Sequence, residues 1–372
     1  MPTALKVLKV LDFSTLLPGP FASMYLADMG AEVIHVESPS RPDLVRIMPP
    51  YANGQATAHS YLNRNKQSIA LDLKDAANIE MIRNKISEFD ILLEQFRPDV
   101  MRRLGLDYDT LAEINPRLIY CSITGYGQTG TYKDRAGHDI NYLALAGVSG
   151  HSGRQDGGPP PLGIQIADVA GGSLHAVIGI LAAVVERQRS GMGQYIDISM
   201  TDCVASLNSM AASASLAGQT PQGPEQGMLN GAIFYDYYET KDGRYFSVGS
   251  LEPQFMTGLA AALDLPILMA KGSSFDPEDR QAIKQALKEK FSSKDFAEWQ
   301  SIFSQLDICV EPVLSLDEAL TSPIAKQRGW VVDVPLSENT DQTEPQLACP
   351  IKFSRSQMRY QFIGQGLGQG KW

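Results

Sequence analysis

The chain has few of the residues that build disulfide frameworks and metal sites. Only four of its 372 residues are cysteines, and five are histidines. The cysteines lie far apart without a Cys-x-x-Cys pair, at Cys121, Cys203, Cys309 and Cys349. Because zinc sites need clustered ligands and disulfide-stapled folds are dense in cysteine, the sequence predicts reduced thiols, no metal ion and no redox cofactor.

Basic charge and long apolar runs are also scarce. The 32 Lys and Arg residues are outnumbered by 42 Asp and Glu residues, which gives a net charge of −10. Since basic patches attract polyanions, we expect neither nucleic acid nor an anionic membrane as a partner. The longest apolar stretch, residues 174–185, is shorter than the roughly 20 residues of a transmembrane helix, and the N-terminus lacks the pattern of a signal peptide. The sequence therefore predicts a cytoplasmic protein.

Strand and helix patterns alternate through the first half of the chain. An apolar run over 6–13, a short helix over 21–29 and a second strand over 31–37 form a β-α-β pattern. Residues 167–189 predict a long apolar helix. Alternating patterns of this kind indicate an α/β fold with a mostly parallel sheet. Further strands are predicted over 69–73, 91–94, 118–123 and 194–200.

The length and a change of composition predict two domains. A chain of 372 residues exceeds the roughly 150 residues of one typical domain. Residues 211–232 are rich in Ala, Ser, Gly, Gln and Pro, and a hairpin with Gly243 in its turn follows them. Helices are predicted over 276–291 and 293–303. We expect a large domain over 1–195, a linker over 196–232, a small domain over 233–328 and a return to the large domain over 329–372.

A glycine-rich loop follows the strand predicted over 118–123. Gly125, Gly127 and Gly130 match the Gly-x-Gly-x-x-Gly pattern of dinucleotide-binding loops. The residues after Gly130 are too broken by glycine and charge to open the helix that would hold a pyrophosphate. The loop is therefore interpreted as a turn at a strand end, which is where ligand crevices of α/β folds also form.

Three residues stand out as candidates for acid/base chemistry, and each has an ordinary structural alternative. His138 could serve as a helix cap or a core residue. Asp168 could be a helix N-cap, although Gly171 and Gly172 weaken the first turns of its helix and suggest that something approaches the backbone closely. Glu252 could be an exposed residue ahead of a proline.

Arginines follow the strands of the N-terminal half. Side chains there could bind the phosphates of a nucleotide through their forked donors, or could simply be solvated. They are Arg41, Arg46, Arg64 with Lys66, Arg97, Arg102 and Arg103.

Together these segments resemble the family III CoA-transferase superfamily and, within it, the α-methylacyl-CoA racemase branch. The likeness rests on residues 10–37, 63–74, 96–106, 120–130, 137–142, 167–172 and 252–255. It implies a Rossmann-like large domain with a mostly parallel sheet, a smaller α+β domain and an interlocked homodimer. It also implies an active site between the large domain of one subunit and the small domain of the other.

The resemblance also implies roles for individual residues. His138 and Asp168 would be the acid/base pair that inverts the α-carbon of a 2-methylacyl-CoA through an enolate. Glu252 would support His138, and the backbone amide of Asp139 would donate to the thioester oxygen. CoA, as part of the substrate, would be bound by Arg41, Arg46, Lys66, Arg97 and Arg103. Related sequences often carry an arginine at the position of Ser38, and Arg41 is the nearby candidate to replace it.

Two other activities compete with this interpretation. In an acyl-CoA:carboxylate CoA-transferase, Asp168 would act as a nucleophile. Transferases of the superfamily generally lack the histidine of Gly-His-Asp-Ile-Asn-Tyr and carry a glycine-rich loop where this chain has residues 249–255. A binding protein without catalysis is the second alternative, and the presence of His138, Asp168 and Glu252 argues against it.

Overall fold

The structure, a computed structural model, describes residues 2–274 and 276–372. These residues divide into two compact units. Unit 1 contains the chain up to Ala146 together with Leu162–Ser209 and Pro323–Trp372, whereas unit 2 contains Gly147–Pro161 and Met210–Ser322.

The unit boundaries differ from the domain boundaries expected from the sequence. Residues 147–161, expected in the large domain, belong to unit 2, where Arg154 pairs with Glu225 at 2.8 Å and with Asp236 at 2.7 Å. Residues 196–209, expected in the linker, and 323–328, expected in the small domain, belong to unit 1. The segment predicted to be a linker is partly helical, since Ser209–Leu216 forms the helix α9. None of the residues of α9 is buried.

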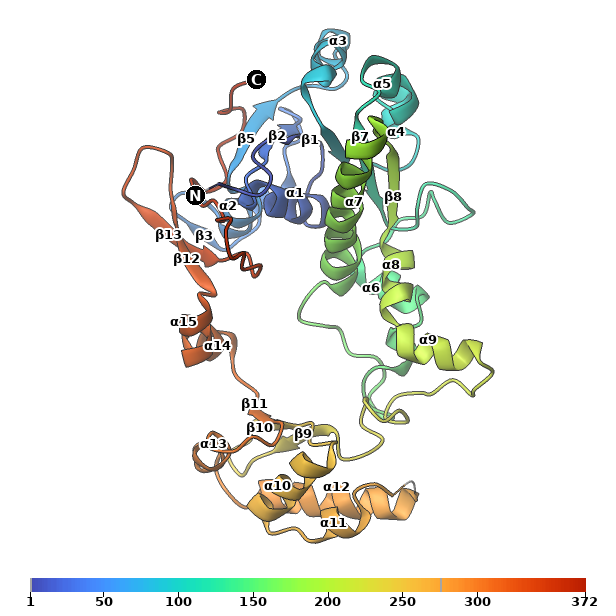
Figure 1. Ribbon diagram of the computed structural model, residues 1–372, viewed down its shortest axis with the longest axis vertical. Coiled ribbons are helices and arrows are strands. Elements are labelled where there is room, and N and C mark those ends of the chain that lie inside the picture. Colours follow the sequence, from blue (N-terminus) through green and yellow to red (C-terminus); the bar gives the residue numbers. More distant parts are fainter. Residues whose placement is uncertain (1, 275) are drawn as a thin grey trace. The chain divides into compact units, whose positions relative to one another are not determined.

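Unit 1 is built on a parallel sheet, which confirms the predicted α/β class. Six strands of the described chain pair in the order β5-β2-β1-β6-β7-β8, all in parallel (Figure 1). The order reverses between β1 and β6, the point at which open α/β sheets form ligand crevices. The strands are β1 Lys9–Asp12, β2 Glu32–Glu37, β5 Lys66–Ala70, β6 Ile91–Glu94, β7 Ile119–Thr124 and β8 Tyr195–Ser199.

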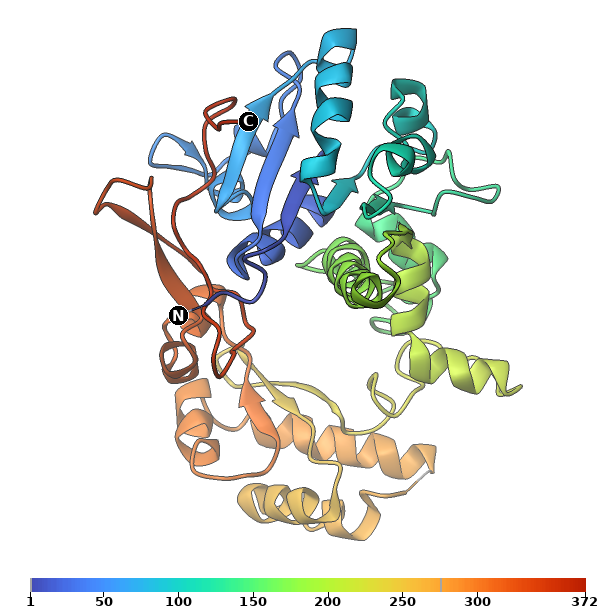
Figure 2. The same ribbon diagram turned by 45° about the horizontal axis from the view of Figure 1, so that its top comes forward.

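Helices pack against both faces of this sheet. Ile82 and Leu111, from α3 and α5, join the buried side chains of one face, and α1 and α7 cover the other (Figure 2). Their bounds are α1 Pro18–Asp28, α2 Thr57–Leu62, α3 Ala76–Lys85, α4 Val100–Leu104, α5 Tyr108–Ile114, α6 Asp139–Leu145, α7 Leu174–Ser190 and α8 Met200–Leu207. Short 3₁₀ turns cover Leu44–Ile47, Ile86–Glu88 and Ser149–His151.

The long apolar helix predicted over 167–189 is present but begins irregularly. Ala167–Ser173 (η4) is a π-helix, which leads into α7. By length and composition alone Ala167–Ser190 is apolar enough to cross a membrane, a test that core helices of soluble proteins also pass. Ile180 and Ala183 of α7 are buried, and the helix packs against β7 and β8.

The C-terminal segment completes unit 1. The strands β12 Val331–Pro335 and β13 Thr343–Leu347 form an antiparallel pair, as do β3 Tyr51–Ala52 and β4 Gln55–Ala56. Beyond them, the backbone N–H of Arg359 donates to Asp28 O at 2.7 Å, and that of Gly370 donates to Ser68 O at 2.7 Å. The tail therefore lies along β5 and α1. The helix α15, Pro323–Arg328, leads into this segment.

Unit 2 combines a small sheet with helices. In the part of unit 2 that the structure describes, β9 Asp236–Glu239, β10 Tyr245–Val248 and β11 Val310–Pro312 form an antiparallel sheet. The predicted hairpin is present, with Gly243 at φ +79° in its turn. Aromatic rings of Phe246, Phe291 and Trp299 fill the core. The helices are α10 Pro253–Leu263, α11 Ile267–Lys271, α12 Pro277–Phe291, α13 Phe296–Phe303 and α14 Leu316–Thr321.

Candidate active site

The glycine-rich loop after β7 folds around the side chain of Tyr142. A Cβ atom on Gly125 would lie 2.5 Å, and one on Gly137 2.6 Å, from Tyr142 Cε1. The Tyr142 hydroxyl donates to Gly137 O at 2.6 Å, and burial is the main cause that raises the pKa of this phenol to about 12. The glycines thus allow close packing within the protein, and the loop leads directly to His138.

His138 is the N-cap residue of α6 and lies on the surface of unit 1. Its backbone N–H donates to Asn141 Oδ1 at 3.0 Å, and its carbonyl accepts from the backbone N–H of Asn141 at 2.8 Å. Both bonds use the backbone of His138. They fix the start of α6, and His138 remains exposed.

Asp139 links the start of α6 to the start of the π-helix η4. Its Oδ1 accepts from the backbone N–H of Ala167 at 2.6 Å and of Asp168 at 3.0 Å. The backbone N–H of Asp139 itself, at the first position of α6, has no acceptor in the described part of the chain. That N–H is therefore free to donate to a ligand, as a helix N-terminus allows.

Asp168 lies in the first turn of η4 and is partly buried. The pKa of its carboxyl is raised from 3.8 to about 6, mainly by burial and also by the charge of Asp139, whereas the charge of His138 lowers it. A carboxyl that titrates near neutral pH can exchange protons in both directions, which is the property of a general acid/base. Because the Asp168 N–H donates to the side chain of Asp139, the residue next to His138, the backbones of His138 and Asp168 lie in one region of unit 1.

The close approach expected at Gly171 and Gly172 comes from the protein itself. A Cβ on Gly172 would lie 3.0 Å from Met200 Cγ and 3.3 Å from Ile123 Cγ2, and one on Gly171 would lie 3.3 Å from Met200 O. The glycines therefore let α8 and β7 pack against η4 and hold it in place.

One further contact positions η4, another fixes the turn ahead of α1, and sequence reasoning missed both. The Ser173 hydroxyl lies 2.7 Å from Pro18 O at the start of α1 and 3.0 Å from Asp168 O. Ahead of α1, Leu16 has φ +61°, and both carboxylate oxygens of Asp43 accept its N–H at 3.0 Å. Leu16 and Pro18 lie in the segment 10–37 that carries the family resemblance, but no pattern there or around Asp43 and Ser173 predicts which residues make these contacts.

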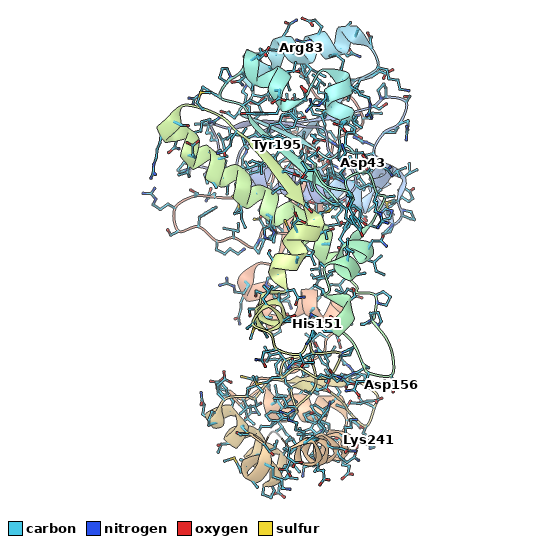
Figure 3. The ribbon with its side chains drawn as sticks, turned by 90° about the vertical axis from the view of Figure 1, so that its right-hand side faces the viewer. Asp43, Arg83, His151, Asp156, Tyr195 and Lys241 are labelled. Carbon is cyan, nitrogen blue, oxygen red and sulfur yellow. The ribbon has the colours of Figure 1, made fainter. Side chains whose placement is uncertain are left out.

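Three of the five predicted CoA-binding side chains belong to exposed residues. They are Arg41, Arg97 and Arg103. The backbone N–H of Arg41 donates to Ser38 Oγ at 3.2 Å, so Ser38 fixes the loop that carries Arg41. Arg97 lines a cavity of about 350 Å³ in unit 1. Tyr195, which is labelled in Figure 3, also lines this cavity.

The other two, Arg46 and Lys66, are engaged within unit 1. Arg46 forms a two-bond pair with Glu37, at 2.9 and 2.5 Å. Lys66 is 1% exposed, and its ammonium contacts Pro20 O at 2.9 Å, Asn63 Oδ1 at 3.1 Å and an Asp12 oxygen at 3.5 Å. Since an ammonium has three donors, a CoA contact from Lys66 would require one of these interactions to break.

Glu252 belongs to a different compact unit from the other candidate residues. It is the N-cap residue of α10 in unit 2 and is exposed, whereas His138, Asp139 and Asp168 belong to unit 1. Its support of His138 stays a prediction. Among residues 2–274 and 276–372, no group of three or more His, Cys, Asp or Glu side chains could hold a metal ion.

Comparisons with known proteins match nearly the whole chain. The model of the CoA-transferase family III matches residues 5–368. The chain is 41% identical to the mouse α-methylacyl-CoA racemase over 87% of this chain and 81% of the mouse protein. It is 33% identical to the human succinyl-CoA:glutarate CoA-transferase over 89% of this chain and 76% of that protein. A solved CAIB/BAIF family protein from Brucella suis, 30% identical, superposes with a TM-score of 0.86 and covers 99% of this chain and 97% of its own.

Proposed function

Because this chain belongs to the CoA-transferase family III, we propose that it acts on acyl-CoA thioesters and racemises 2-methylacyl-CoA substrates at the α-carbon. The observation that carries the proposal is the Asp168 carboxyl, with a pKa of about 6 and with His138 close enough to influence it. The identity shared with the mouse α-methylacyl-CoA racemase supports the same reaction.

The reaction needs two acid/base groups, one that removes the α-proton and one that delivers a proton to the α-carbon. A proton next to a thioester carbonyl is weakly acidic, so its removal requires a base and a donor that stabilises the enolate oxygen. In one direction Asp168 removes the α-proton and protonated His138 delivers a proton to the opposite face of the planar enolate. In the other direction the roles reverse, so both protonation states must be accessible near neutral pH.

The remaining parts of the site bind and orient the substrate. The free backbone N–H of Asp139 is suited to donate to the thioester oxygen as negative charge develops there. The exposed guanidinium groups of Arg41, Arg97 and Arg103 are suited to the phosphates of CoA. We further propose a homodimer in which Glu252 of a second subunit supports His138.

A CoA-transferase with Asp168 as nucleophile is the alternative function. The 33% identity to a succinyl-CoA:glutarate CoA-transferase favours it. A partly buried carboxylate could also attack a thioester carbonyl. Such a mechanism gives His138 no proton to transfer, which is why we prefer racemisation.

The decisive experiment uses one epimer of a 2-methylacyl-CoA in deuterium oxide. Racemisation predicts that deuterium enters at the α-carbon while stereochemical purity is lost. Transfer of CoA to added succinate or glutarate without α-deuteration would overturn the proposal.

Two variants separate the candidate mechanisms. A racemase should lose at least about 10²-fold in rate with either His138→Ala or Asp168→Ala, because each group transfers a proton. A transferase should lose activity with Asp168→Ala and keep it with His138→Ala. Asp333→Ala, which changes an exposed residue on β12, is the matched control.

A further inference from the structure

The carboxylate of Asp139 has a role of its own, separate from that of its backbone N–H. One oxygen, Oδ1, accepts both hydrogen bonds from η4, at 2.6 Å from Ala167 N and 3.0 Å from Asp168 N. These are the first two residues of η4, whose backbone N–H groups lack partners within their own helix. The residue before η4, Ile166, makes no side-chain cap bond. Asp139 therefore supplies from α6 the cap that η4 lacks locally.

This contact connects the two residues that exchange protons. His138 precedes Asp139 directly in the chain, and the backbone N–H of Asp168 donates to the Asp139 carboxylate. A carboxylate that accepts two backbone N–H groups is a strong and directional anchor. Movement of α6 relative to η4 would break these hydrogen bonds, so this side chain helps to fix the positions of His138 and Asp168, in addition to the packing of α8 and β7 against η4.

The same carboxylate also places a negative charge beside the Asp168 side chain. Its charge raises the Asp168 pKa, and His138 lowers it. Tyr142, also on α6, is the third titratable group that interacts with Asp168. The other elements packed against η4 also carry titratable groups, but in the part of the chain that the structure describes none of them contributes to the shift of the Asp168 pKa. These groups include Tyr25, Asp28, Cys121, His175, Tyr195, Asp197, Asp202 and Cys203.

We propose that Asp139 is a positioning residue, whose carboxylate fixes the Asp168 backbone against the start of α6 and sets the charge next to the Asp168 side chain. This inference rests on the proposed function, because it concerns the proton transfer between His138 and Asp168. It assigns two separable effects to one side chain: the hydrogen bonds need an oxygen acceptor, and the electrostatic effect needs a negative charge.

Asp139→Asn separates the two effects. Asparagine retains an oxygen that can accept both N–H groups, but it removes the charge. The pH at which Asp168 titrates should fall by about one unit, as expected when a nearby like charge is removed. The rate–pH profile of each epimer should then move to lower pH on the limb that Asp168 controls, in the same direction for both epimers. A merely structural defect would lower the rate at every pH and leave both limbs in place.

Asp139→Ala removes the acceptor as well. We expect kcat at the optimal pH to fall about 10²-fold with a small change in KM, because misplaced proton-transfer groups affect the chemical step. Asp139→Asn should recover most of this loss at its own optimum. The matched control is Asp75→Asn, which changes the exposed N-cap residue of α3, whose carboxylate accepts from Ala77 N at 2.9 Å, and should keep the parent profile.

A direct titration makes the test independent of catalysis. In the full-length protein with ¹³C-labelled aspartate, the Asp168 carboxyl signal is assigned by its loss in Asp168→Asn and followed with pH. A lower midpoint in Asp139→Asn than in the parent supports the inference, and equal midpoints overturn it. Equal rates for the Ala and Asn variants would overturn the positioning role. Absence of α-deuteration in the parent would instead refute racemisation, so the two failures are distinguishable.

Discussion

Replacement of Asp168 by asparagine is predicted to stabilise the protein at alkaline pH while it removes activity. The folded-state pKa of about 6 lies above the ordinary value of 3.8, mainly because the carboxyl is partly buried. The folded protein therefore binds this proton more tightly than the unfolded chain does. It follows that stability is lost as pH rises from about 4 to about 6, and that the full penalty remains above pH 6.

The magnitude follows from the same two values. The difference between 3.8 and about 6 corresponds to about 3 kcal/mol once the carboxyl is ionised in both states. Because Asp168 is only partly buried, solvent screening reduces the expected penalty to about 1–2 kcal/mol. Asparagine is neutral at every pH in this range, so Asp168→Asn should gain that amount at pH 8 and roughly half of it at pH 5.

Urea unfolding followed by circular dichroism measures the effect at pH 5 and pH 8. Asp333→Asn is the control, because an exposed substitution of this kind changes stability by less than about 0.5 kcal/mol. A gain that is absent at pH 8, or equal at both pH values, would refute the reasoning that the site holds Asp168 at a raised pKa.

Further variants test the site and its supports. For the epimer whose α-proton Asp168 removes, kcat/KM should fall as pH drops below about 6, because the carboxyl with a pKa of about 6 becomes protonated; a flat profile from pH 5 to 8 would contradict this role. Gly125→Ala should destabilise the protein by about 1–3 kcal/mol in urea unfolding, because its Cβ would lie 2.5 Å from Tyr142 Cε1 in a packed ring. Arg64→Met should cost about 3–5 kcal/mol, because it leaves the buried Asp28 carboxylate without its 2.6 Å partner, and the double variant with Asp28→Leu should recover part of the loss; no recovery would show that the pair is not the cause. Ser173→Ala should lower the unfolding free energy by about 1 kcal/mol through its lost bonds to Pro18 O and Asp168 O, and an unchanged midpoint would show that these bonds do not stabilise η4.

The elements of unit 1 could be predicted because their signals are local. The strand expected over 91–94 is β6 Ile91–Glu94, since a short apolar run between turns is typical of a buried parallel strand. The helix expected over 167–189 occupies Ala167–Ser190, but its π-helical start was not foreseen. That start depends on glycine contacts with Met200, which is nearly thirty residues away.

The interactions that position the site could not be read from local patterns. Arginine and lysine are rarely buried, yet Arg64 and Lys66 are 0% and 1% exposed. Their burial depends on Asp28 and Asp12, which are distant in sequence and become neighbours only through the parallel sheet and α1. The side-chain role of Asp139 likewise requires a contact across 28 residues, which no spacing rule predicts.

Unit 1 is built from segments that lie on both sides of unit 2 in the chain, so it can be completed only late in synthesis. Its sheet is made early, but Pro323–Trp372, which covers α1 and β5, emerges from the ribosome only after all of unit 2. Domains tend to fold as they are made, so unit 2 should be complete while unit 1 still exposes the β5 edge. During that interval the nascent chain presents an unpaired strand, which makes it a target for chaperones and a source of aggregation when translation stops early.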